Sequence, residues 1–113
     1  MASGRRTSWN QRGLAIHVDH EQVPLPYWAA SVPFGELGPS QWKPALSRLV
    51  ERGFRVVEIA LTWAEHEPSP GHFSWSHQHD LRGFVRAAGA LGLATVVHMG
   101  PCAGTHRPRF GLP

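Results

Sequence analysis

The chain has 113 residues, of which 42% are apolar and 17% charged, and its formal net charge is +3 at pH 7. This length allows one small domain at most, and the apolar content is typical of a globular chain rather than a disordered one. The basic residues are mostly scattered and no recognition motif accompanies them, so we expect no nucleic-acid partner.

Two further features limit the class of protein. The N-terminal segment lacks the apolar stretch of a signal peptide and the longest apolar runs are too short to span a bilayer, so we expect no membrane partner and take the cytoplasm as the default location. A single cysteine, Cys102, excludes an intramolecular disulfide, and we interpret it as a small buried side chain.

The first third of the chain is expected to contain a flexible leader followed by two strands. Residues 1–12 are rich in Gly, Ser, Thr, Asn and Arg, which predicts a flexible leader. A strand is expected over residues 14–18, followed by a hairpin turn at 19–22. Two prolines then exclude a central strand, so the next strand is expected over residues 27–32.

A helix is predicted after Ser40, which we take as its N-cap. Apolar residues follow at the spacing of one helical face: Trp42, Ala45, Leu46, Leu49 and Val50. Pro44 lies early enough in the helix to be tolerated, and Gly53 supplies the left-handed residue that ends it.

The pattern then repeats. Residues 55–61 form a β-branched run that is apolar on both faces except for Glu58, which is typical of a parallel strand. A second apolar helical stripe runs from Leu81 to Gly92, and residues 93–98 give another buried strand. Alternating strands and helices predict an α/β fold, in which the loops after the strands carry function. These loops are residues 33–39, 62–78 and 99–113.

Residues 56–75, VVEIALTWAEHEPSPGHFSW, and the segment that begins at His79 carry a resemblance to a known family. The sequence from about residue 14 to 113 resembles the N-terminal part of the catalytic barrel of glycoside hydrolase family 35, the β-galactosidases. The residues in register with the family are Trp63, His66, Glu67, Pro68, Pro70, Gly71, Phe73, Asp80, Leu81, Phe84, Gly92, Leu93, Gly100, Pro101, Gly111, Leu112 and Pro113.

The resemblance implies an α/β fold that is part of a (β/α)8 barrel, with about the first three strands and two helices in residues 13–113. It implies a parent enzyme that hydrolyses terminal β-galactosides with retention, using two glutamates roughly 5 Å apart and no cofactor. In the family these glutamates follow the fourth and seventh barrel strands. We therefore expect both to lie beyond Pro113, and the 113-residue chain to be an inactive fragment whose parent binds a carbohydrate.

The same resemblance gives four candidate substrate-binding residues, Trp63, Glu67, Thr105 and His106. Several positions depart from the family where the sugar should be held, among them Arg107 in place of a Trp and Phe110 in place of the first Gly of a Gly-Gly pair. Ala60 stands where many members have Tyr, and His106 ends a segment where members usually have a galactose-binding Glu. These departures leave open a degenerate, non-catalytic carbohydrate-binding or interaction fragment, and a family 42-like barrel is a further alternative.

Each candidate also has a structural interpretation. Glu67 is expected to accept backbone N–H bonds and fix its loop, Glu65 to be solvated, and Trp63 to serve either as a stacking platform for a sugar or as packing at the top of the barrel. The histidines at 66, 72, 77 and 79 with Asp80 could suggest a metal site, but a His-x-His pair at the start of a helix is a weak signal. His98 is interpreted either as a core histidine or as one that supports neighbouring site residues.

Overall fold

The computed structural model describes residues 6–10, 13–18, 21–24 and 28–100, with side chains described from residue 28. The strands are β1 (Arg6–Asn10), β2 (Gly13–Val18), β3 (Glu21–Pro24), β4 (Ala29–Ser31), β5 (Val56–Ala60) and β6 (Ala94–His98). The helices are α1 (Pro39–Glu51), α2 (Trp63–His66) and α3 (Leu81–Ala90), with 3-10 turns η1 (Phe34–Glu36) and η2 (His77–His79).

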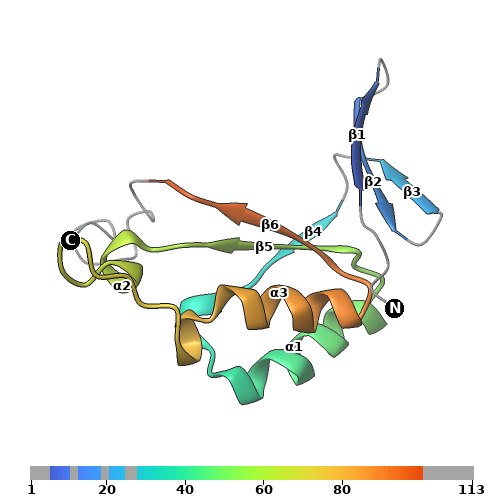
Figure 1. The fold of residues 1–113 in the computed structure, drawn as a ribbon. Helices are drawn as coiled ribbons and strands as arrows, with labels where there is room; N and C mark the ends of the chain where they lie inside the picture. Colours follow the sequence, from blue (N-terminus) through green and yellow to red (C-terminus); the bar gives the residue numbers. More distant parts are fainter. Residues whose placement is uncertain (1–5, 11–12, 19–20, 25–27, 101–113) are drawn as a thin grey trace.

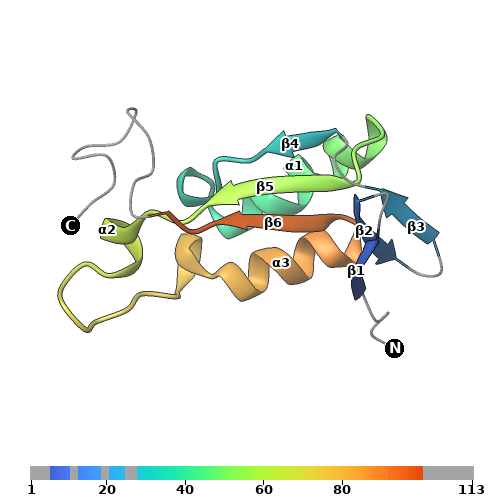
Figure 2. The same ribbon diagram turned by 90° about the horizontal axis from the view of Figure 1, so that it is seen from above.

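Strands β4, β5 and β6 form a parallel sheet in chain order. Helix α1 connects β4 to β5 and α3 connects β5 to β6, and both helices lie on the same face of the sheet (Figures 1 and 2). The predicted α/β fold is confirmed, and these two strand–helix units are the start of a (β/α)8 barrel. The strand expected over residues 27–32 is shorter in the structure, where it is β4. The N–H of Val32, just after β4, still donates to the Glu58 carbonyl at 2.8 Å.

Both long helices end in the same way. The N–H of Gly53 donates to the carbonyl of Val50 and that of Phe54 to Leu49, and the equivalent pairs after α3 are Gly92 to Gly89 and Leu93 to Ala88. These are the two hydrogen bonds of a Schellman motif. Gly53 and Gly92 have φ angles of 89° and 81°, which L side chains rarely adopt. The predicted glycine stops are confirmed at both helices.

The start of α1 differs from the prediction. Gly38, not Ser40, is the N-cap, and its N–H donates to Oε1 of Gln41 at 3.0 Å. Pro39 occupies the first helical position, where its missing N–H and its fixed φ cost nothing. The helix therefore begins before Ser40, because a Gly-Pro pair with a downstream Gln provides a cap that the search for a Ser or Thr side chain missed.

The main core lies between the sheet and the two helices. Its centre is aromatic, since Phe34 and Phe84 pack edge to face with ring centroids 5.2 Å apart, and Trp42 contacts both rings. The buried residues of this cluster are Val32, Phe34, Trp42, Leu46, Val57, Ile59, Leu61, Phe84, Ala88 and Leu93. The apolar stripes predicted for the two helices thus point at the sheet.

The first sheet is antiparallel, in the order β1-β2-β3. Figure 1 shows it beside the end at which strands β4 to β6 begin. We expected a flexible leader over residues 1–12, which is wrong for Arg6–Asn10 because these residues pair with β2. The hairpin after β2 is confirmed, although Glu21 and Gln22 belong to strand β3 rather than to the turn, and Pro24 sits on an edge strand as its missing N–H requires.

Candidate functional site

Residues 62–80 form a segment at the carboxyl edge of the parallel sheet, which we call the rim segment. It follows β5 and contains α2, a Pro-Gly turn and η2 before α3 begins. Figures 1 and 2 both show α2 beyond the end of strand β5, on the side opposite to the β1–β3 sheet. Active sites of (β/α)8 barrels lie at this edge of the sheet, so the rim segment is in the position expected for a functional loop.

Glu67 holds the turn of the rim segment together. Its Oε1 accepts the backbone N–H of Gly71 at 2.8 Å, and its Oε2 accepts the indole N–H of Trp63 at 2.5 Å. Gly71 has a φ angle of 78°, which only glycine adopts easily. The Gly71 hydrogen bond, followed by the Trp63 hydrogen bond, lowers the pKa of Glu67. The carboxylate therefore fixes the loop, as the structural interpretation predicted.

His66 anchors the rim segment to the core. Its side chain is 6% exposed, and its ring lies parallel to that of Phe34 with centroids 6.2 Å apart. Trp75 lies against it with ring centroids separated by 4.8 Å. The Nδ1 atom is 3.2 Å from the Ser74 carbonyl, which can only accept, so Nδ1 carries the proton of the neutral ring.

A second histidine lies beside the first. The ring centroids of His66 and His79 are 5.2 Å apart, and Nδ1 of His79 is 3.1 Å from Oγ of Ser74. The pKa of His66 is lowered mainly because burial disfavours its charged form, and repulsion by His79 adds to this effect. The Ser74 hydrogen bond and the charge of Glu65 act in the opposite direction. His66 is thus a neutral structural ring near pH 7.

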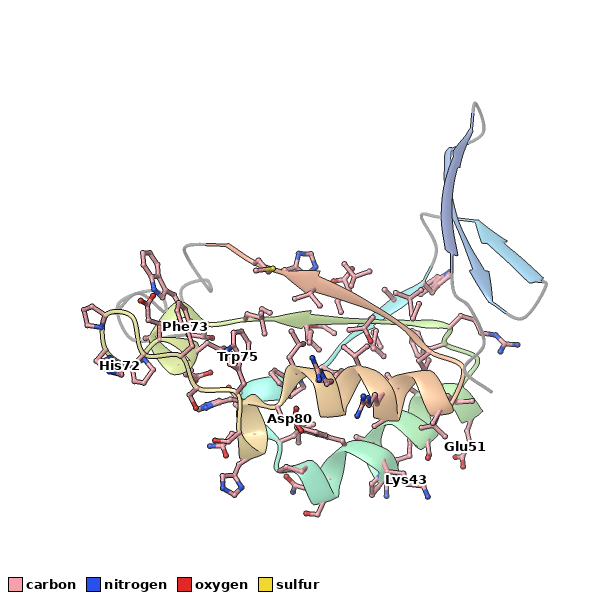
Figure 3. All side chains as sticks on the ribbon, viewed as in Figure 1. Lys43, Glu51, His72, Phe73, Trp75 and Asp80 are labelled. Carbon is pink, nitrogen blue, oxygen red and sulfur yellow. The ribbon has the colours of Figure 1, made fainter. Side chains whose placement is uncertain are left out.

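Next to these residues the rim segment borders an open cavity of about 350 Å³, which we call the aromatic cavity. It is lined by Leu61, Thr62, Trp63, His66, Glu67, Phe73, Trp75, Met99 and Gly100. Trp63 is 45% exposed, and Phe73, Trp75 and Met99 are exposed as well. Figure 3 shows Phe73 and Trp75 on the rim segment, near the carboxyl ends of the strands. Sequence reasoning selected Trp63 but not the other three.

The sheet face opposite to the helices carries a polar pair. Glu58 on β5 and His98 on β6 approach to 3.4 Å between Oε2 and Nε2, and their side chains are 42% and 59% exposed. The interpretation of His98 as a core histidine is therefore wrong, because it is the last residue of β6 and points to the face that α1 and α3 leave uncovered. The alternative, a histidine that supports neighbouring site residues, stays a prediction. Ala60 pairs with His98 in the strand register.

The remaining sequence predictions have mixed outcomes. Thr105, His106 and Cys102 lie outside the described residues. Within the described ranges no three His, Cys, Asp or Glu side chains are placed together to hold an ion. The pair His77 and His79 lies in the 3-10 turn η2 rather than at the start of α3, whose N-cap is Asp80.

Across the described residues, no helix has the length and apolar character needed to cross a membrane.

Comparison with known proteins agrees with this arrangement. Residues 17–113 match the family described as glycosyl hydrolases family 35. The chain belongs to this family. Its relatives include a β-galactosidase of Felis catus, 28% identical over 117 residues that cover 99% of this chain and 17% of that protein. A β-galactosidase of Homo sapiens is 30% identical over 90 residues, covering 80% of this chain and 13% of that protein.

The fold has a counterpart among solved structures. A family 39 glycoside hydrolase from Bacteroides cellulosilyticus aligns with a TM-score of 0.51 over 77% of this chain and 20% of that one, at 14% sequence identity. At that identity the likeness concerns the fold alone. This family 35 chain spans about a sixth of the length of the β-galactosidases it matches.

Proposed function

We propose that this chain forms the first three strands of the catalytic barrel of a glycosidase that removes terminal β-galactosyl groups. The observation that supports the proposal most is the match to family 35 over residues 17–113, together with the parallel order of β4, β5 and β6. In this proposal β4, β5 and β6 are the first, second and third strands of the barrel.

The chemistry in this proposal is a retaining displacement by two glutamates, one acting as nucleophile and the other as acid and base. In the family these glutamates follow the fourth and seventh barrel strands, and the described residues provide three parallel strands. Glu67 is a carboxylate of the rim segment, and both of its oxygens accept hydrogen bonds, from Gly71 and from Trp63. We therefore propose that both catalytic groups follow Pro113 and that the 113-residue chain has no glycosidase activity of its own.

Two of the proposed substrate-binding residues have different roles in this account. Trp63 offers an exposed ring at the carboxyl edge of the sheet, which suits stacking against the apolar face of a bound molecule. Glu67 contributes mainly by holding that ring, because its two oxygens accept hydrogen bonds from the rim segment itself. Thr105 and His106 stay predictions of sugar contact.

The test combines sequence and activity. The coding sequence after Pro113 should contain an Asn-Glu pair following a fourth strand and a second Glu following a seventh. The protein that includes them should hydrolyse 4-nitrophenyl β-galactoside, and Glu→Gln at either position should reduce kcat by several orders of magnitude. A longer protein without this pair, or one inactive on all terminal β-galactosides, would support the degenerate carbohydrate-binding alternative instead.

A further inference from the structure

Exposed apolar surface is concentrated at the rim segment. Four of the five large apolar side chains that are exposed among the described residues line the aromatic cavity, and the fifth, Trp28, precedes β4 at the opposite edge of the sheet. Contiguous exposed aromatic surface is uncommon in soluble proteins and usually marks a contact site. The clustering of Trp63, Phe73, Trp75 and Met99 around one cavity therefore makes this cavity a candidate contact site for an apolar group.

Several polar atoms of the cavity are already engaged in hydrogen bonds within the rim segment. Both oxygens of Glu67 accept hydrogen bonds, from Gly71 and from Trp63, and Nδ1 of His66 donates to Ser74. A galactosyl ring presents hydroxyl groups on most of its edges and needs several donors and acceptors that are free to bond it. The aromatic cavity instead offers ring faces and a thioether, which favour a flat ligand with few polar groups.

The hydrogen bond between Trp63 and Glu67 also gives the cavity a fixed wall. Because the indole N–H donates to a carboxylate four residues along the chain, the ring plane of Trp63 is held in one orientation although 45% of the side chain is exposed. A stacking surface that is ordered before binding costs less conformational entropy when the ligand arrives. Glu67 is thus a positioning residue for Trp63.

The location of the cavity sets its relation to the reaction. Leu61 and Thr62 follow β5, and Met99 and Gly100 follow β6, so the cavity opens at the carboxyl edge, beside the uncovered face that carries Glu58 and His98. We propose that the aromatic cavity binds a flat, apolar leaving group, such as the aryl group of an aryl β-galactoside, and not the galactosyl ring. The identity of the sugar in this inference rests on the proposed function. The apolar group is inferred from the cavity alone.

The test is a titration of the 15N-labelled 113-residue chain followed by NMR of the indole N–H signals. The probes are 4-nitrophenyl β-galactoside and methyl β-galactoside, which share the sugar and differ in the leaving group. The aryl glycoside should shift the signals of Trp63 and Trp75 in a saturable way, and the methyl glycoside should not. Trp28, exposed at the other edge of the sheet, and buried Trp42 are internal controls.

A variant tests the same contact without disturbing the core. Phe73 is 62% exposed, so Phe73→Ala should keep the chain folded and weaken binding of the aryl glycoside roughly three- to tenfold, and Trp28→Ala should leave it unchanged. In the longer enzyme, Phe73→Ala should lower kcat/KM for the aryl glycoside more than for the methyl glycoside. This second measurement applies even if the short chain aggregates.

Several outcomes would overturn the inference. Equal shifts with the methyl glycoside would assign the cavity to the sugar, and equal shifts of Trp28 would indicate non-specific adsorption. An unchanged ratio of kcat/KM values in Phe73→Ala would remove the cavity from substrate binding. If the aryl glycoside binds at Trp63 and Trp75 but the longer protein hydrolyses no galactoside, the proposed function fails while the apolar site stands.

Discussion

The helix-covered face of the parallel sheet and the rim segment are stabilised in different ways. The first is a core of residues far apart in sequence, in which Phe34, Leu46 and Phe84 are almost completely buried. The second is held by hydrogen bonds between residues three to eight positions apart and by one buried ring, His66. The barrel framework thus depends on packing, whereas the shape of the candidate site depends on a few polar contacts that single substitutions can remove.

The largest expected effect is in the core. Phe84→Ala should lower the free energy of unfolding by about 3–5 kcal/mol, because it removes a ring that contacts Phe34 and Trp42 and leaves a cavity. Denaturant unfolding followed by tryptophan fluorescence measures this loss. Phe73→Ala is the matched control, since the same change at an exposed ring should cost less than about 1 kcal/mol. Equal losses in the two variants would refute the proposed difference between the regions.

A smaller effect is expected at the helix ends. Gly53→Ala places a side chain at a φ angle of 89° and should cost about 1–2 kcal/mol through backbone strain. No atom lies within 4 Å of the added Cβ, so a steric clash does not contribute. Gly38→Ala, at an extended N-cap with φ of −73°, should cost clearly less, and the two melting curves compare them directly. A neutral Gly53→Ala would argue against the Schellman motif.

These helices show how far sequence reasoning reached. The apolar stripes, the glycine stops and the β-branched runs identified α1, α3, β5 and β6, because each signal depends on local conformation and on burial of one face. The contacts of the rim segment were less accessible. Backbone N–H bonds to Glu67 were expected, although the donor Gly71 was not identified. The burial of His66 against Phe34 requires η1 and α2 to approach in space, and Trp75 and Met99 become neighbours only through the fold.

The buried histidine of the rim segment predicts a pH dependence of the free energy of unfolding. His66 has a lowered pKa in the folded state, so its neutral form stabilises the fold fully above the ordinary value of 6.5. That stability is lost as the pH falls through the lowered pKa, because the unfolded chain binds the proton more readily. Unfolding free energies measured between pH 8 and 5 should therefore decrease towards acid.

His66→Phe provides the control for this pH effect, since it retains an aromatic ring against Phe34 and Trp75 but cannot bind a proton. The acid-side slope between pH 8 and 5 should become shallower in this variant. A slope as steep as that of the unchanged chain would show that other groups cause the pH dependence.

The smallest expected effect concerns the orientation of Trp63. Glu67→Gln weakens two charge-assisted hydrogen bonds at the rim and should move the Trp63 indole N–H signal while the signals of α1 and α3 stay in place. Glu51→Gln, on the exposed face of α1, is the control and should leave that signal unchanged. Because the folded pKa of Glu67 is lowered, the same signal should also move as the pH falls below 4.5.

The central claim is that the rim segment shapes a binding site and that the catalytic carboxylates are contributed by residues after Pro113. The most direct measurement is release of nitrophenolate from 4-nitrophenyl β-galactoside by the purified 113-residue chain. We expect no turnover, with activity appearing in the longer protein that carries both glutamates. Turnover by the short chain that persists through repurification, and is lost on substitution of Glu67 or Glu58, would contradict this account.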